Sequence, residues 1–289
     1  MRAEFKHSLR RARGQIIGWG LGAFLYGVLM VSFYSSVESI GAELNTLMES
    51  FPPEMLAFFP GFDDFTSPVG YLGTEYFSFM PIILGIFAVT AGARLLVSDE
   101  EKGILDLLMA YPISRSSMFW GRFSAFLVTS MGILLAAWAG LMLPSQSSGL
   151  GLTAIELLRP SLPLFGVMIF FGSFGLMLSM LLPAGRTSGA FAGALLIANF
   201  LLIGLSSLNE NLVPLYEISP FYFYQGSRAI NALDWDSLAI LLAGSSLFTG
   251  VALIRFLRRD LRVGGEGGWQ FSLPGFLKRG EAPAEVGAD

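Results

Sequence analysis

Apolar residues in this chain gather in six long continuous runs separated by polar stretches. An α-helix rises about 1.5 Å per residue, so about 20 apolar residues cross a hydrocarbon layer about 30 Å thick. The runs have about that length, and none shows the two-residue alternation of a β-barrel strand. The pattern predicts an all-α polytopic membrane protein with six transmembrane helices. The expected spans are residues 16–36, 76–97, 123–143, 162–182, 187–208 and 238–256.

The first run has a second interpretation, because basic residues precede it as they precede the core of a signal peptide. It is longer than the usual core of about 7–15 apolar residues, and no small-residue cleavage site closes it. The pattern therefore favours a first span that stays in place.

The basic residues are unevenly distributed between the two sides of the expected bundle. All but Arg159 and Arg228 of the 18 Lys and Arg residues fall on the side of the two termini, whereas segment 37–75 has none. Cytoplasmic loops carry an excess of Lys and Arg. An even number of spans also puts both ends on one side. We therefore expect both termini in the cytoplasm, with loops 37–75 and 209–236 outside.

The N-terminal residues 1–15 have the pattern of an amphipathic helix. Phe5, Leu9, Ala12 and Ile16 recur at three- and four-residue steps, with Arg and Lys between them. Two interpretations stay open: charged flanks that fix the topology, or an interface helix that touches a partner. After the transmembrane domain 16–257, the tail 258–289 is rich in Gly, Pro and charge and is expected to be loosely ordered in the cytoplasm.

The connection between the second and third spans, within residues 98–117, predicts a short amphipathic helix outside the bilayer. Ser98 and Glu101 have the spacing of a capping box. An apolar cluster at 104–109 follows, and Pro112 ends the helix. The next helix is expected to start at Ser114 or Ser116. The apolar face needs a cover, which a membrane surface or a groove on a soluble partner would provide.

This connection resembles the inner loop of ABC exporter permeases of the type-two class, which are six-span subunits that pair with separate ATPase subunits. The resemblance rests on residues 100–103, 105–108 and 111–115, with Ile104 and Asp106 where that family usually has Thr and Glu. The basic N-terminus, segment 219–221 and segment 258–260 also resemble family features.

The resemblance implies that the loop is a coupling helix docked on an ABC ATPase subunit. It further implies export across a prokaryotic plasma membrane by a homodimer or heterodimer of permease chains. This chain would then carry no cofactor, since ATP and magnesium would bind the partner. The residues expected to carry the coupling are Glu100, Glu101, Gly103, Leu105, Leu107, Leu108 and Pro112.

Glycines recur at four-residue steps in the first and fifth expected spans. Small residues at this spacing let helices approach closely. In the resembling family these two spans line the dimer interface and the pathway, and ordinary packing within one subunit is the alternative. The residues assigned to dimer or pathway packing are Gly14, Gly18, Gly22, Gly185, Gly189, Gly193 and Asn199.

Composition agrees with a lipid environment, because only 14% of residues are charged, against about 25% in soluble domains. There is no cysteine, and the single histidine, His7, has no second histidine with which to hold a metal. The net charge of −4 gives no reason to expect nucleic-acid binding.

The motifs of several enzyme classes are missing from the chain. No Gly-Lys dipeptide, no Gly-x-Ser-x-Gly and no His-Glu-x-x-His occurs, so no P-loop, serine-hydrolase elbow or zinc-protease motif is present. We therefore expect no enzymatic activity in this chain. An ion-coupled secondary transporter or a non-transporting membrane scaffold are the alternatives, although the charged residues of the spans lie only at their ends.

Overall fold

The computed structural model describes residues 1–41, 43, 51–52, 65–101, 114–182 and 185–258. These residues form helices and connecting turns, with no strand among them. Six helical segments are long and apolar enough to cross a membrane, which confirms the predicted all-α protein with six spans. They are Arg13–Ser39, Pro68–Arg94, Arg115–Ser145, Ala154–Leu181, Thr187–Leu208 and Trp235–Arg258.

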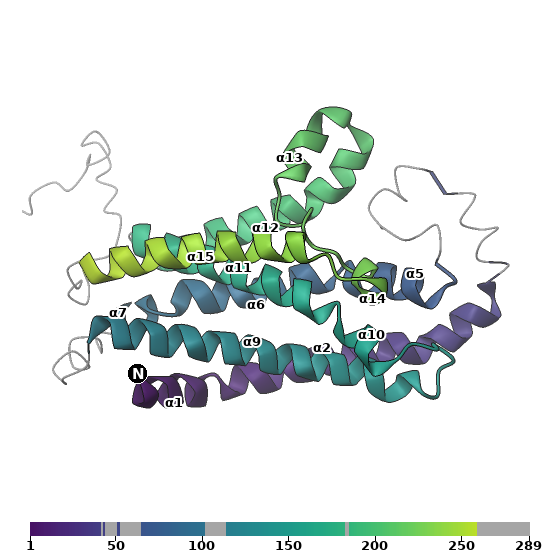
Figure 1. The fold of residues 1–289 in the computed structure, drawn as a ribbon, viewed down its shortest axis with the longest axis horizontal. Helices are drawn as coiled ribbons and strands as arrows, with labels where there is room; N and C mark the ends of the chain where they lie inside the picture. The colour runs from purple at the N-terminus through teal and green to yellow at the C-terminus, as the bar shows by residue number, and fades with distance from the viewer. Residues whose placement is uncertain (42, 44–50, 53–64, 102–113, 183–184, 259–289) are drawn as a thin grey trace, which may run out of the picture.

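Each span contains one principal helix, and shorter helices extend or connect the spans (Figure 1). The principal helices are α2 (Arg13–Ser39), α6 (Met80–Arg94), α9 (Arg115–Ser145), α11 (Ser161–Leu181), α12 (Gly185–Leu208) and α15 (Trp235–Arg258). The shorter elements are α1 (Arg2–Arg11), α5 (Pro68–Leu72), the π-helix η2 (Gly73–Phe77), α7 (Val97–Glu101), α10 (Ala154–Leu158), η3 (Glu210–Leu212), α13 (Val213–Glu217) and α14 (Arg228–Asn231).

The second span begins earlier than the hydropathy pattern predicted, at Pro68 instead of residue 76. Ser67 caps this helix, since its side chain accepts a hydrogen bond from the Gly70 amide at 3.0 Å, and Pro68 occupies the first turn. The expected outer loop 37–75 is wrong in its last eight residues, which are helical. Ser67 and Pro68 form a helix start signal at this position, although the first residues of the helix are only partly apolar.

Two further helix starts differ from, or agree with, their expected positions. α7 begins at Val97, so Ser98 lies inside its first turn, one residue after the helix start, where the capping box with Glu101 had been expected to begin. Ser114, by contrast, caps α9 as one of the two expected starts, because its side chain accepts a hydrogen bond from the Ser117 amide at 3.2 Å.

The middle of the bundle is formed by α6 and α11, which pack along each other. In the most apolar stretch of their two spans 61% and 67% of residues are buried, against 22% in the spans of α2, α12 and α15. α2 packs along α9, α15 packs on α11, and α12 packs on α6 and α11. α13 and the adjoining end of α12 project from the rest of the bundle (Figure 1).

Two helix pairs approach closely through glycines. A Cβ on Gly140 of α9 would lie 2.2 Å from the Phe24 carbonyl oxygen of α2, and one on Gly92 of α6 would lie 2.0 Å from the Gly172 carbonyl oxygen of α11. Real Cβ atoms do not reach such distances, so larger side chains there would force the backbones apart. These contacts set the spacing of the bundle.

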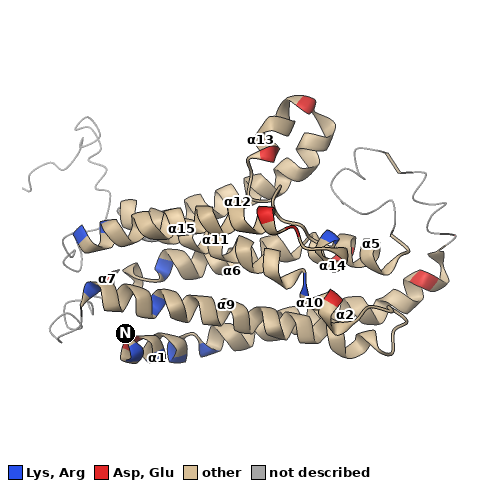
Figure 2. Cartoon of the chain, in the orientation of Figure 1, with Lys and Arg blue, Asp and Glu red and all other residues tan. Residues whose placement is uncertain are grey.

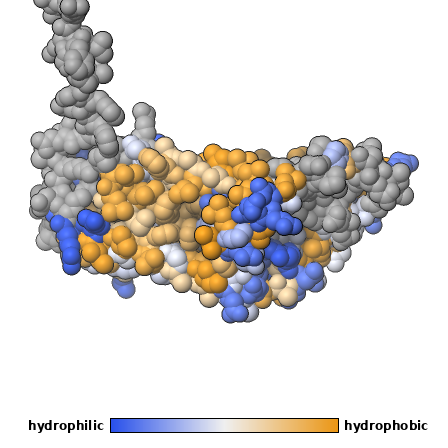
Figure 3. Space-filling model, turned by 90° about the horizontal axis from the view of Figure 1, so that it is seen from above, coloured by the Kyte–Doolittle hydropathy of each residue, from blue (hydrophilic) through white to orange (hydrophobic). Residues whose placement is uncertain are grey.

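Charge separates the two ends of the bundle (Figure 2). Lys and Arg gather at the end formed by α1, α7 and the last turn of α15, which we call the basic end; α5, α10 and α14 lie at the opposite end. Apolar side chains form a broad area on the face that Figure 3 shows, with hydrophilic side chains beside it. This arrangement suits a bundle whose middle lies in lipid and whose ends lie in water.

Candidate functional site

The main ionic feature of the described residues is a cluster at the basic end centred on Arg122, which is 4% exposed. Its Nε donates to Glu4 Oε1 of α1 at 2.8 Å, and its Nη2 donates to Asp99 Oδ2 of α7 at 2.7 Å. Its Nη1 donates to the Leu95 carbonyl at 3.2 Å. One guanidinium of α9 therefore joins the N-terminal helix to the start of the connection between spans two and three.

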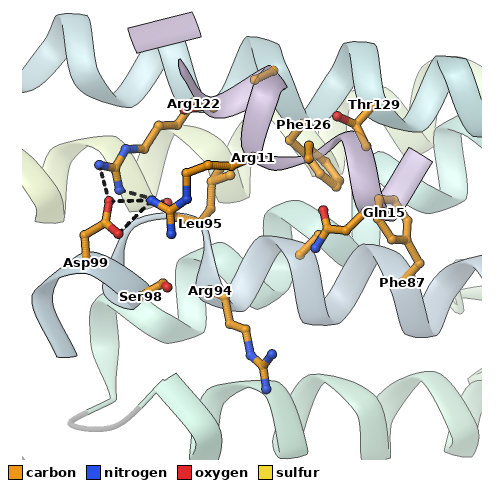
Figure 4. A pocket seen from close by; sticks show the side chains of 14 residues that line it. Arg11, Gln15, Phe87, Arg94, Leu95, Ser98, Asp99, Arg122, Phe126 and Thr129 are labelled. Atoms are coloured by element: carbon orange, nitrogen blue, oxygen red, sulfur yellow. Dashed lines mark hydrogen bonds and ion pairs between the residues drawn. The ribbon is translucent and has the colours of Figure 1, made fainter. Parts of the chain in front are cut away.

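Arg11 of α1 completes this cluster. Its Nη1 donates to both carboxylate oxygens of Asp99, at 2.8 and 3.1 Å. Figure 4 shows the carboxylate held between the two guanidinium groups. We call Glu4, Arg11, Asp99 and Arg122 the Arg122 cluster; its two acids and two bases balance.

The Asp99 carboxylate stays ionised although it is buried. Burial raises its pKa, but the hydrogen bond from Arg11 and the charges of Arg122 and Arg11 lower the pKa by more than burial raises it. The pKa of Asp99 therefore lies below its ordinary value. An isolated charge removed from water costs several kcal/mol. The paired geometry offsets that cost, so loss of Arg122 would leave Glu4 and Asp99 buried without the cation that they share.

Local sequence explains why these residues meet. α9 starts at Arg115, so Arg122 lies two turns inside this helix, about 10 Å from its start. α1 packs along α9, and a Cβ on Gly121 would lie 3.0 Å from the Glu4 side chain. The missing side chain at Gly121 therefore lets Glu4 lie against α9, close enough for Arg122 to bind it.

Most of the predicted coupling residues lie in segment 102–113, outside the described residues. Glu100 and Glu101 belong to α7. Glu100 is 7% exposed, so it would have to turn outward to pair with another subunit. Those outside the described residues are Gly103, Leu105, Leu107, Leu108 and Pro112.

Most of the glycines assigned to dimer or pathway packing make no close contact with the part of this chain that the structure describes. A Cβ on Gly14, Gly18, Gly22 or Gly193 would meet nothing within 4 Å, and one on Gly189 would lie 3.7 Å from the Ala93 side chain. Gly185 is the first residue of α12. Packing against the described residues of the same subunit therefore leaves these four positions open, and their expected role at a dimer face or pathway stays a prediction.

Asn199 is partly exposed, and its amide donates to the Leu195 carbonyl of its own helix at 2.8 Å. Among the described residues, it makes no hydrogen bond to another helix. The Asn199 side chain is thus held locally, and its expected role at a dimer face or pathway remains a prediction.

The sequence interpretation did not recognise Glu4 or Arg11 as site residues, and it placed Arg122 only at a span end. A signal was present, because a helix start at Ser114 puts Arg122 two turns inside a helix, where an unpaired charge would be costly. Glu4 was also the only acid in a strongly basic segment. Their partnership crosses 118 residues of sequence, which no local pattern encodes.

These features define a multi-pass helical membrane protein with an ion-paired junction at one end. A comparison with protein families shows that residues 2–261 match the model described as ABC-2 family transporter protein. The chain therefore belongs to the ABC-2 transporter family and is an ABC transporter permease. Membrane components of this family are normally not catalytic themselves. A comparison with curated proteins found no match.

Proposed function

We propose that this chain is the membrane subunit of an exporter driven by ATP that a separate ABC ATPase subunit hydrolyses. Membership of the ABC-2 family over residues 2–261 carries the proposal. The ATPase subunit would bind the connection between α7 and α9, which contains the predicted coupling residues. The excess of Lys and Arg at the basic end supports a cytoplasmic position for this junction and both termini in a prokaryotic plasma membrane.

The Arg122 cluster gives this junction a means of transmitting movement. Asp99 lies three residues before segment 102–113, and Arg122 lies in the helix that follows that segment. Since Arg122 also binds Glu4, displacement of the connection would pull on α1 as well as on α9. We expect the three segments to move as one unit when the ATPase subunits close.

The coupling role is tested by replacing Leu107 and Leu108 together with Asp. The variant should insert in the membrane, but an epitope-tagged permease should no longer copurify with its ABC ATPase subunit, and transport-linked ATP hydrolysis should fall. A matched control replaces Leu215 and Ile218, which are 53% and 75% exposed near α13, with Asp. Unchanged capture and turnover in the Leu107 and Leu108 variant would count against the proposal.

We also propose that a second permease chain packs against the open glycine face of α2. Gly14, Gly18 and Gly22 lie on this face, where a Cβ would meet nothing within 4 Å. The chain has no cysteine, so a single introduced cysteine reports only on its own position. Gly18→Cys should give a disulfide-linked permease dimer in membranes, whereas Ile254→Cys, an exposed position on α15, should not. Equal cross-linking at both positions would exclude this face.

A further inference from the structure

A cavity of about 270 Å³ adjoins the Arg122 cluster, between α1 and α2 on one side and α6 and α7 on the other. α9 contributes the remaining wall. A single water needs only about 10–15 Å³ of such space, so this cavity can hold a larger group. It lies where spans 1, 2 and 3 reach the basic end of the bundle.

The cavity carries one positive charge that the cluster does not neutralise. Arg94, the last residue of α6, lines it, and Figure 4 shows its side chain extending away from the ion pairs. Among the residues that the structure describes, Arg94 makes no side-chain hydrogen bond or ion pair. Since the Arg122 cluster sums to zero, Arg94 makes the lining net positive.

The cavity changes from charged to apolar along its length. Arg11, Arg94 and Asp99 lie toward the basic end, whereas Phe87 and Phe126 lie deeper in the bundle. The deep part also holds an unsatisfied group: Thr129 is 2% exposed, and its hydroxyl has no hydrogen-bond partner in the described structure. Thr129 lies seven residues beyond Arg122, about 10 Å further along α9.

We infer that this cavity binds the headgroup region of an anionic phospholipid from the adjoining leaflet. The phosphodiester would accept hydrogen bonds from the exposed part of Arg11, which is 46% exposed. Arg94 would donate to it after its side chain, which extends away from the ion pairs in Figure 4, turns toward the cavity. The Thr129 hydroxyl would donate to a glycerol ester carbonyl, and the aromatic rings would contact the first acyl carbons. A lipid suits the site better than free phosphate, because an inorganic ion would leave the apolar depth and Thr129 without a ligand.

The test measures thermal unfolding of the purified permease in detergent, with added phosphatidylglycerol, phosphatidylcholine or inorganic phosphate. Phosphatidylglycerol should raise the Tm more than phosphatidylcholine, and inorganic phosphate at the same concentration should not reproduce the rise. Arg94→Gln should lose at least half of the lipid-induced rise. Arg255 is an exposed arginine of α15 at the same basic end of the bundle, and Arg255→Gln should keep the full lipid-induced rise in Tm.

Thr129→Val is the second variant, because it keeps the side-chain shape while removing the hydroxyl. It should retain less copurifying phosphatidylglycerol than the unmodified protein when bound lipid is measured by mass spectrometry. The inference is overturned if Arg94→Gln and Arg255→Gln lose equal parts of the response, which would indicate general surface attraction. It is also overturned if phosphatidylcholine or inorganic phosphate stabilises as strongly as phosphatidylglycerol, or if no lipid changes the Tm.

Discussion

The two ends of the bundle are held together by different chemistry. At the basic end, Arg122 binds Glu4 and Asp99 through charged hydrogen bonds of 2.8 and 2.7 Å. At the opposite end, tyrosine hydroxyls bind backbone carbonyls: Tyr71 donates to Met30 at 2.9 Å and Tyr224 donates to Phe77 at 3.1 Å. One end therefore depends on pairs between guanidinium and carboxylate groups. The other depends on hydrogen bonds to backbone carbonyls, most of them from neutral donors, although Arg159 also donates to the Ile230 and Asn231 carbonyls there.

The π-helix η2 explains why the neutral contacts converge where they do. Its wide turn is closed by a bond of 2.9 Å from the Ser78 amide to the Gly73 carbonyl, five residues back. The carbonyls of Glu75 and Phe77 accept hydrogen bonds from Tyr26 and Tyr224, respectively. The second span is thus tied to α2 and to the segment before α15. These hydrogen bonds between hydroxyl and carbonyl groups do not change as the pH varies around neutrality.

The difference indicates which end can respond to a partner. One side chain of α9, Arg122, joins α1 and α7, so its contacts to both helices are lost together. Loss of this cation leaves two buried carboxylates unpaired, which is costly. Independent neutral bonds fail one at a time. We therefore expect the basic end to transmit movement and the opposite end to act as a comparatively constant anchor.

The largest expected effect is that of Arg122→Met. It leaves Glu4 and Asp99 buried without their central cation, which costs about 3–5 kcal/mol when a buried pair is broken. Thermal unfolding in detergent should show a large loss of Tm, whereas Arg255→Met should be close to neutral. Adding Glu4→Gln and Asp99→Asn should recover part of the loss. A loss no greater than that of Arg255→Met would refute the central role of Arg122.

A smaller effect is expected at the close approach of α2 and α9. In Gly140→Ala the new methyl would overlap the Phe24 carbonyl, at a cost of about 1–3 kcal/mol for overpacking. Gly250→Ala on α15 is the control, because a Cβ there would meet nothing within 4 Å. It should be neutral or slightly stabilising. Equal Tm values for the two variants would contradict the packing argument.

At the opposite end, Tyr224→Phe should cost about 1 kcal/mol, since it removes one neutral hydrogen bond to the Phe77 carbonyl. Tyr222→Phe is the control, as Tyr222 is 44% exposed. The Tm loss should be well below that of Arg122→Met. A loss as large as that of the arginine variant would remove the distinction between the two ends.

The existence of the six spans could be predicted because each contains a continuous apolar run of about the required length. Their bounds could be predicted only in part: Ser114 was expected as a helix start, whereas Ser67 starts a helix well before the apolar run begins. The four-residue glycine spacing was visible in the sequence, but Gly92 and Gly140 set the helix contacts. Such glycines have no periodic signal, because their partners lie on other helices.

The Arg122 cluster was also beyond local sequence patterns. Asp99 lies in the first turn of α7, where an acid suits a helix start, but its partners come from α1 and α9. Charge pairing across distant segments depends on tertiary packing. What the sequence did provide was the surplus of acids and bases around the connection, which the fold then pairs.

The last prediction concerns the titration of Asp99, which leaves the Tm unchanged at neutral pH and is specific to the basic end. Its pKa in the folded protein lies below its ordinary value of 3.8, because the hydrogen bond from Arg11 and the charges of both arginines outweigh burial. A lowered pKa contributes stability that is present above about pH 4 and is lost as the pH falls through the folded-state value. As the pH is lowered from about 5, the Tm of the unmodified protein should therefore fall more steeply than the Tm of Asp99→Asn. Tyr224→Phe should keep the full acid dependence, and identical pH profiles for all three proteins would show that the charged junction does not stabilise the fold.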